Sequence, residues 1–140
     1  MRKSHKAFAA IAALTALLAG IHAVAAHHSA AMYDDKAIVA ITGTIKEVRW
    51  VNPHASVLVY GTLDERGEPT EWLLETTSPG RLTRLGWTRT SFNAGDRVVV
   101  EIHPLRDAQQ HGGSIQKITS VATGKSVGTN LRELDSPDRE

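Results

Sequence analysis

The sequence predicts an all-β fold with one short helix, and three observations support this. Alternating apolar residues, many of them β-branched, recur in five segments that turn residues separate. The period becomes helical only once, between the third and fourth segments. The first segment is long, contains a glycine and changes phase near its end, as a strand does when it bends around a small barrel. Three strands, a helix and two strands is the order of a five-stranded OB-like barrel, which we expect over residues 36–122.

The first expected strand covers residues 36–50. Apolar side chains alternate from Val39 to Ile45, whereas Val48 is out of phase by one residue. A β-bulge between Ile45 and Val48 would return the later apolar side chains to the inner face. Gly43 would let the strand bend sharply, because glycine adds no side chain at the bend.

The other strands follow from the same alternation. They are expected at residues 55–60, 70–76, 97–103 and 114–121, with a long flexible loop at 104–113. The helix is expected near residues 79–86, because Ser78 suits an N-cap, Pro79 suits the first helical position and Gly86 ends the pattern. Residues 123–140 are polar and without periodicity, which predicts a flexible tail.

Residues 1–26 have the pattern of a signal peptide for export. A basic head precedes an apolar run, and small residues end it at Ala25 and Ala26, either of which suits cleavage. The mature protein would then begin near His27 in the periplasm, with residues 27–35 as its N-terminal segment. The apolar run is too short for a retained membrane span, and the chain has no cysteine for a lipid anchor, so no membrane anchor is expected.

The composition excludes several classes of function. Removal of 26 of the 140 residues leaves 114, enough for one small domain. The leader takes three of the sixteen basic residues and none of the fifteen acidic ones, so the mature net charge is −2. Such a domain has no general attraction for phosphate backbones, and no nucleic-acid partner is expected. No nucleophile motif or zinc-hydrolase motif is present, so we do not expect an enzyme.

The candidate metal ligands are His27, His28 and His54. With cleavage after Ala26, the terminal amine and the imidazole of His27 form a chelate suited to Cu(II). With cleavage after Ala25, His28 is the third residue, and the amine, two backbone nitrogens and the imidazole surround the ion. His54 follows a proline turn at the expected barrel rim, where OB-folds contact ligands, and would complete the site. The alternatives are a solvated terminus and an ordinary surface histidine.

The remaining candidates are interpreted structurally. His103 and His111 flank the long loop and are expected at the surface. Trp87 lies among three arginines, which suggests either a patch for single-stranded nucleic acid or a helix face over the barrel end, and the acidic mature charge favours the second. Trp50 and Trp72 are expected to fill or flank the core, with their indole N–H groups bonded at the rim.

Five stretches of the chain match a known family: His27–Ser29, Gly43–His54, Trp72–Pro79, Leu82–Arg89 and Gly95–Asp96. Through them the chain resembles the small exported bacterial proteins of domain-of-unknown-function family 6152. The resemblance implies that the doubled histidine and the Asn-Pro-His turn recur as family features, and it implies no activity.

The function expected from the sequence is that of a small periplasmic, non-enzymatic binding or accessory module for a protein or small-molecule ligand. The alternative is a copper-binding protein that uses His27 or His28 with His54.

Overall fold

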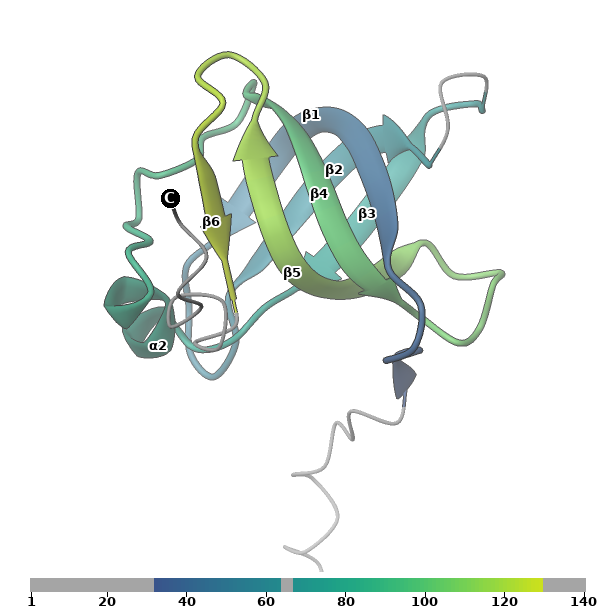
Figure 1. Cartoon of the computed structure of the whole chain (residues 1–140), viewed down its shortest axis with the longest axis horizontal. Helices are drawn as coiled ribbons and strands as arrows, with labels where there is room; N and C mark the ends of the chain where they lie inside the picture. The colour runs from purple at the N-terminus through teal and green to yellow at the C-terminus, as the bar shows by residue number, and fades with distance from the viewer. Residues whose placement is uncertain (1–31, 64–66, 130–140) are drawn as a thin grey trace, which may run out of the picture. The chain divides into compact units, whose positions relative to one another are not determined.

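The computed structural model describes residues 32–63 and 67–129, which hold one short helix and six strands (Figure 1). In chain order these elements are β1 (Val39–Arg49), β2 (Ser56–Thr62), β3 (Thr70–Glu75), α2 (Pro79–Arg84), β4 (Arg97–Pro104), β5 (Gly112–Ser120) and β6 (Ser126–Gly128). The expected signal peptide and most of the segment 27–35 lie outside the described residues.

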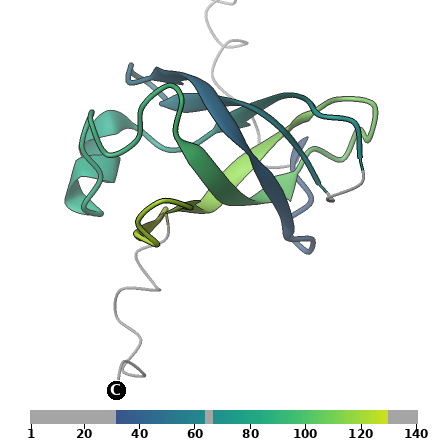
Figure 2. The same cartoon turned by 90° about the horizontal axis from the view of Figure 1, so that it is seen from above.

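The first five strands form a closed barrel, which Figure 2 shows from above. β1 pairs antiparallel with both β2 and β4, β2 pairs antiparallel with β3, and β4 pairs antiparallel with β5. A parallel pairing of β3 with β5 joins the two ends of this series. The helix lies between β3 and β4 in the chain, so the predicted five-stranded OB-like barrel is confirmed.

The core is formed by apolar side chains that alternate along the strands, as the sequence pattern indicates. The most completely buried ones are Ile41, Ile45, Val57, Val59, Leu74, Leu82, Val98, Val100, Ile102, Ile115 and Ile118. Trp72 is 6 % exposed, and its indole Nε1 donates to the Gly61 carbonyl at 3.2 Å, as expected for a core tryptophan at the rim. Trp50 is partly buried against the same core.

The predicted bulge in β1 is present. Ile45 pairs with Val59 and Glu47 pairs with Leu58, so Lys46 is the extra residue between two normal pairs. The bulge returns Val48 to the core side and places Glu47 on the outside of the barrel.

The helix begins and ends where the sequence indicates. The Ser78 side chain accepts from the Arg81 backbone N–H, and Gly86 has φ of 89°, a conformation that glycine adopts without strain. After the helix, Trp87 and Phe92 pack against each other within the core at 5.5 Å between ring centroids. Trp87 is 2 % exposed, and its indole Nε1 donates to the Gly128 carbonyl at 3.0 Å.

Two predictions about the C-terminal half need correction. The tail was expected to start at Thr123, but residues 126–128 form β6, which pairs with β5 and receives the Trp87 hydrogen bond. The polar composition hid this strand, because it is short and only half-buried. The loop was expected over residues 104–113, but Gly112 and Gly113 belong to β5 and pair with β3.

We expect Gly43→Ala to destabilise the barrel. A Cβ at residue 43 would lie 2.5 Å from the Tyr60 carbonyl oxygen and 2.7 Å from Val59 Cγ1, so backbone would have to move. Overpacking of this kind costs about 1–3 kcal/mol of unfolding free energy. Gly80→Ala is the matched control, because nothing lies within 4 Å of its added Cβ and residue 80 is helical. Urea denaturation should show a loss for Gly43→Ala only; equal midpoints would contradict the packing argument.

Candidate functional site

Of the three predicted metal ligands, the structure describes only His54. His27 and His28 lie outside the described residues. His54 is exposed on the turn between β1 and β2, and it makes no hydrogen bond with the residues that the structure describes. Within the same residues, no three His, Cys, Asp or Glu side chains gather into a metal-binding group. The Cu(II) site therefore stays a prediction.

The two histidines beside the β4–β5 loop have different surroundings. His103 was expected at the surface, but it is half-buried, and its Nδ1 lies 2.7 Å from the Ala37 carbonyl oxygen. That contact requires the proton on Nδ1 and makes His103 a structural residue. His111 is exposed, as expected, and its ring contacts Trp72 edge-on at 4.9 Å between centroids.

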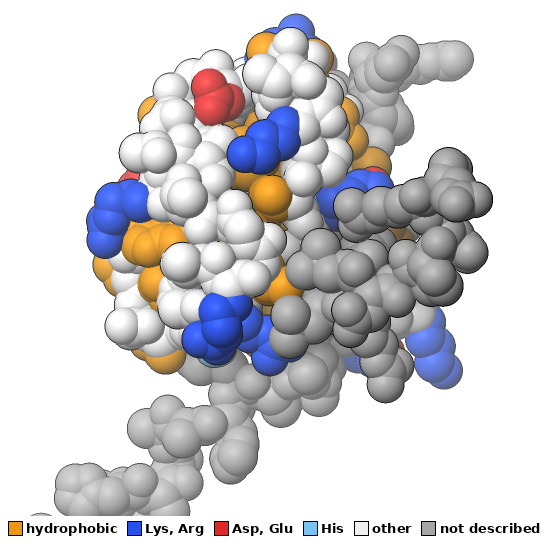
Figure 3. Space-filling view, turned by 60° about the vertical axis from the view of Figure 1, so that its left-hand side comes forward, with side chains coloured by type: hydrophobic (Ala, Val, Ile, Leu, Met, Phe, Trp, Pro, Cys, Tyr) orange, Lys and Arg blue, Asp and Glu red, His pale blue; other side chains and the backbone are white. Residues whose placement is uncertain are grey.

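The suggested basic-aromatic patch around Trp87 is not formed, because this tryptophan is in the core and presents no ring surface for stacking. On the face that Figure 3 presents, Lys and Arg side chains are spread out and do not gather into one field. The alternative interpretation, an arginine-bearing helix at the end of the barrel, fits the structure better.

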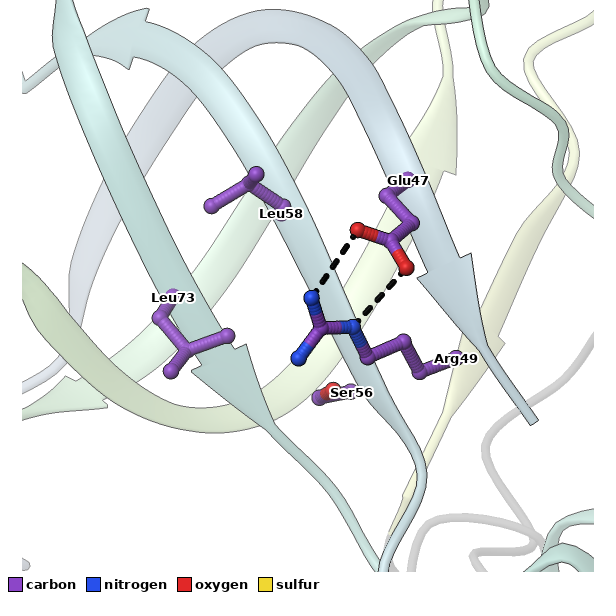
Figure 4. A pocket seen from close by; sticks show the side chains of 5 residues that line it. All are labelled: Glu47, Arg49, Ser56, Leu58 and Leu73. Atoms are coloured by element: carbon purple, nitrogen blue, oxygen red, sulfur yellow. Dashed lines mark hydrogen bonds and ion pairs between the residues drawn. The ribbon is translucent and has the colours of Figure 1, made fainter. Parts of the chain in front are cut away.

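A small apolar depression lies on the outside of the barrel across β1, β2 and β3, and we call it the outer face. It encloses about 160 Å³. Figure 4 shows the side chains that line it, which are Glu47, Arg49, Ser56, Leu58 and Leu73. Leu58 and Leu73 are cross-strand partners, and Leu73 is 47 % exposed. An apolar pair in this position is unusual in an otherwise alternating sheet, because the outward positions of such strands are normally polar.

An ion pair borders the outer face. The guanidinium of Arg49 donates from Nε to Glu47 Oε1 at 2.8 Å and from a terminal nitrogen to Oε2 at 3.2 Å (Figure 4). The hydrogen bonds from Arg49 lower the pKa of Glu47, and the same bonds raise the pKa of Arg49. Both side chains are exposed, so the pair contributes little to stability, but it fixes two opposite charges at the edge of the apolar surface.

A second depression of about 350 Å³ lies where the start of the described chain meets the β4–β5 loop, and we call it the loop pocket. Its lining includes Met32, Tyr33, Leu73, Glu75, Leu105 and His111. Leu73 belongs to both depressions, so the outer face and the loop pocket adjoin along β3.

The segment before β1 is tied to this pocket by its backbone. Tyr33 forms a β-bridge with Leu105, the Asp34 N–H donates to the Pro104 carbonyl at 2.8 Å, and the Arg106 N–H donates to the Met32 carbonyl at 2.9 Å. In Figure 1 this segment leads into β1 next to the β4–β5 loop. We call residues 32–36 the strap.

The Tyr33 side chain adds a contact to β3. Its hydroxyl donates to Glu75 Oε2 at 3.0 Å. Partial burial, followed by the hydrogen bond and the negative charge of Glu75, raises the pKa of Tyr33 well above its usual value.

Sequence reasoning missed both depressions. The outer face was detectable, since Leu58 and Leu73 occupy outward positions of strands that were predicted correctly. The loop pocket gave no such signal, because Met32, Glu75 and His111 are far apart in the chain and only barrel closure brings them together.

A family model matches residues 15–114, which is more than half of the chain. It describes a family of unknown function, DUF6152. The chain belongs to this family. The match confirms the resemblance seen in the sequence and includes every residue of the outer face and the loop pocket. No curated protein and no solved structure matches the chain.

Membership in DUF6152 brings no activity, so the geometry has to support any function. None of the helical residues that the structure describes forms a segment long and apolar enough to cross a membrane.

We expect Tyr33→Phe to lower stability at neutral pH by about 1 kcal/mol, the net value of one such hydrogen bond. The stability difference between the wild type and this variant should then shrink as pH rises above about 10. The pKa of Tyr33 is higher in the folded state than in the unfolded state. The stability that this difference contributes is fully present below the unfolded pKa of tyrosine, and it is lost as pH rises toward the folded-state pKa and the hydroxyl ionises. Urea denaturation at pH 7 and between pH 9 and 11 measures both; a difference that grows with pH would contradict the assignment.

Proposed function

We propose that the protein is an exported, non-enzymatic binding module that holds a partner protein on its outer face. The observation that carries this proposal is the outward-facing pair of half-buried Leu58 and exposed Leu73 beside the charges of Glu47 and Arg49. In barrels of this architecture, the surface of β2 and β3 is a common place for ligands. The analogy concerns architecture only, and the site argument rests on these four side chains.

The size of the outer face favours a protein partner over a small molecule. Pockets for small molecules usually enclose about 300–1,000 Å³, whereas this depression encloses about 160 Å³. That space suits one or two apolar side chains of a partner, and complete burial of one such side chain contributes about 1.5–3 kcal/mol. The Glu47–Arg49 pair would then orient the partner, because its charges attract groups of opposite charge on the partner and repel groups of like charge.

The non-enzymatic part of the proposal is supported by the sequence, which offers no nucleophile motif or hydrolase motif. Export is supported by the basic head, apolar run and small residues of positions 1–26. N-terminal sequencing of the protein from a periplasmic extract would test export, and retention of Met1 would contradict it.

The binding proposal is tested by photo-crosslinking in the host cell. A photoreactive amino acid at residue 58 should give one discrete crosslinked product, whose partner is identified by mass spectrometry. Residue 121 is the matched control, because Val121 is 53 % exposed but lies on the turn after β5, away from the outer face. Arg49→Ala should weaken the residue-58 product. Identical products from residues 58 and 121, or none at residue 58, would refute the proposal.

Cu(II) binding by the terminal histidines is the second candidate. The observation in its favour is that the His54 side chain is exposed and is not engaged by the described residues, so its imidazole is available for coordination. Cu(II) suits an amine and imidazole nitrogens in a planar arrangement. Coordination needs neutral imidazole, so binding should weaken as pH falls below about 6.5.

This candidate requires a native amino terminus at residue 26 or 27. Titration with Cu(II), followed by the visible d–d band, should show tight binding by the processed protein. A tag before the native terminus should make binding much weaker, because it separates the free amine from His27 and His28, and His54→Ala should weaken binding more than His111→Ala. Equal Cu(II) affinity in all of these forms would refute the site and would leave the interpretation of the terminus as a solvated segment.

A further inference from the structure

The loop pocket contains a set of ligands that the Cu(II) hypothesis does not use. Met32 and His111 come from opposite ends of the domain sequence and line the same 350 Å³ depression. Each is exposed enough to meet an incoming ion, with Met32 at 40 % exposure. A thioether and an imidazole are the side chains that suit a soft monovalent metal.

The backbone of Met32, the first residue of the strap, is held in place, whereas its side chain can rotate. The Met32 carbonyl accepts from the Arg106 N–H, and the next residue, Tyr33, is fixed by its bridge to Leu105 and its bond to Glu75. A methionine side chain has three rotatable bonds, so a fixed backbone still lets the sulfur adjust to an ion.

His111 is positioned by its backbone and by its ring. Its carbonyl accepts from the Leu73 N–H at 3.1 Å, which fixes it at the start of β5. Its ring rests against Trp72, itself held by the bond to Gly61. The ring makes no hydrogen bond with the residues described, so its nitrogens are available to a ligand.

The turn before His111 is ordered by a side chain. The Gln110 Nε2 donates to Asp107 Oδ2 at 2.8 Å, and the Gln109 N–H donates to the other oxygen at 3.1 Å. These bonds lower the pKa of the Asp107 carboxyl below its usual value. The loop therefore presents His111 from an internally bonded turn.

We propose that Met32 and His111 are the protein ligands of a Cu(I) site in the loop pocket. The Glu75 carboxylate lines the same pocket and favours a cation electrostatically. One carboxylate with a thioether is a poor set for Mg²⁺ or Ca²⁺, which require several oxygen ligands. A further ligand would come from an exchanging donor or acceptor. This site differs in residues and oxidation state from the Cu(II) hypothesis, and it goes beyond the binding role of the outer face.

The first test measures Cu(I) affinity of the purified protein without oxygen, in competition with the chromophoric chelator bicinchoninate. One Cu(I) per chain is expected. Met32→Leu keeps the side-chain volume without sulfur, and His111→Phe keeps a ring against Trp72 without nitrogen. Each should weaken binding at least about tenfold, because loss of an outer partner of a metal ligand alone costs about 10–100-fold.

Three control variants locate the site. His54→Ala, Arg49→Ala and the double variant His27→Ala/His28→Ala should bind Cu(I) as the wild type does. A weaker residue-58 crosslink in Arg49→Ala, with unchanged Cu(I) affinity, separates the outer-face proposal from this one. Loss of Cu(I) binding in the terminal double variant would place the metal at the amino terminus and overturn the proposal, as would unchanged affinity in Met32→Leu.

A spectroscopic test uses the wild-type protein and therefore does not depend on the folding of a variant. Met1 and Met32 are the only methionines in the chain, so methyl labelling of methionine gives a simple NMR spectrum. Ag(I), a redox-inert monovalent probe of similar softness, should shift the Met32 methyl signal and the His111 ring signals together at one equivalent. An unshifted Met32 methyl at saturating Ag(I) would overturn the proposal.

Discussion

The barrel depends on the short parallel pairing between β3 and β5. Three residue pairs, from Leu73–Gly112 to Glu75–Ser114, join the first and last strands of the five-stranded series. Glycine lets the start of β5 lie close to both neighbouring strands. A Cβ at residue 112 would lie 3.1 Å from the Leu73 carbonyl oxygen of β3, and a Cβ at residue 113 would lie 2.5 Å from Ile102 Cδ1 of β4. Without this pairing, β3 and β5 would keep free edges that invite pairing with other chains. The β3–β5 pairing thus closes the barrel around the core.

The same pairing creates both candidate surfaces. It places Leu73 beside the start of β5, so that one exposed leucine borders the outer face on one side and the loop pocket on the other. The strap then covers the far side of the loop pocket through Tyr33 and Glu75. A partner on the outer face and an ion in the loop pocket would therefore be neighbours, which is a useful arrangement for a module that passes a metal to another protein.

The two exposed histidines of the described residues have different neighbours. His111 lines the loop pocket together with Met32, whereas His54 lies on the turn between β1 and β2. Metal titrations with the single variants therefore distinguish these two histidines.

The sequence by itself determined the strands, the bulge after Ile45 and the short helix, because side-chain period, glycine and capping residues act over a few neighbours. It also indicated the core tryptophan at residue 72. It indicated neither the burial of Trp87 nor β6, since the Trp87 indole and the Gly128 carbonyl that it bonds lie 41 residues apart in the chain. Only the tertiary structure decided which outward residues form a surface and brought Met32 to His111, because those contacts arise from barrel closure and no local pattern encodes them.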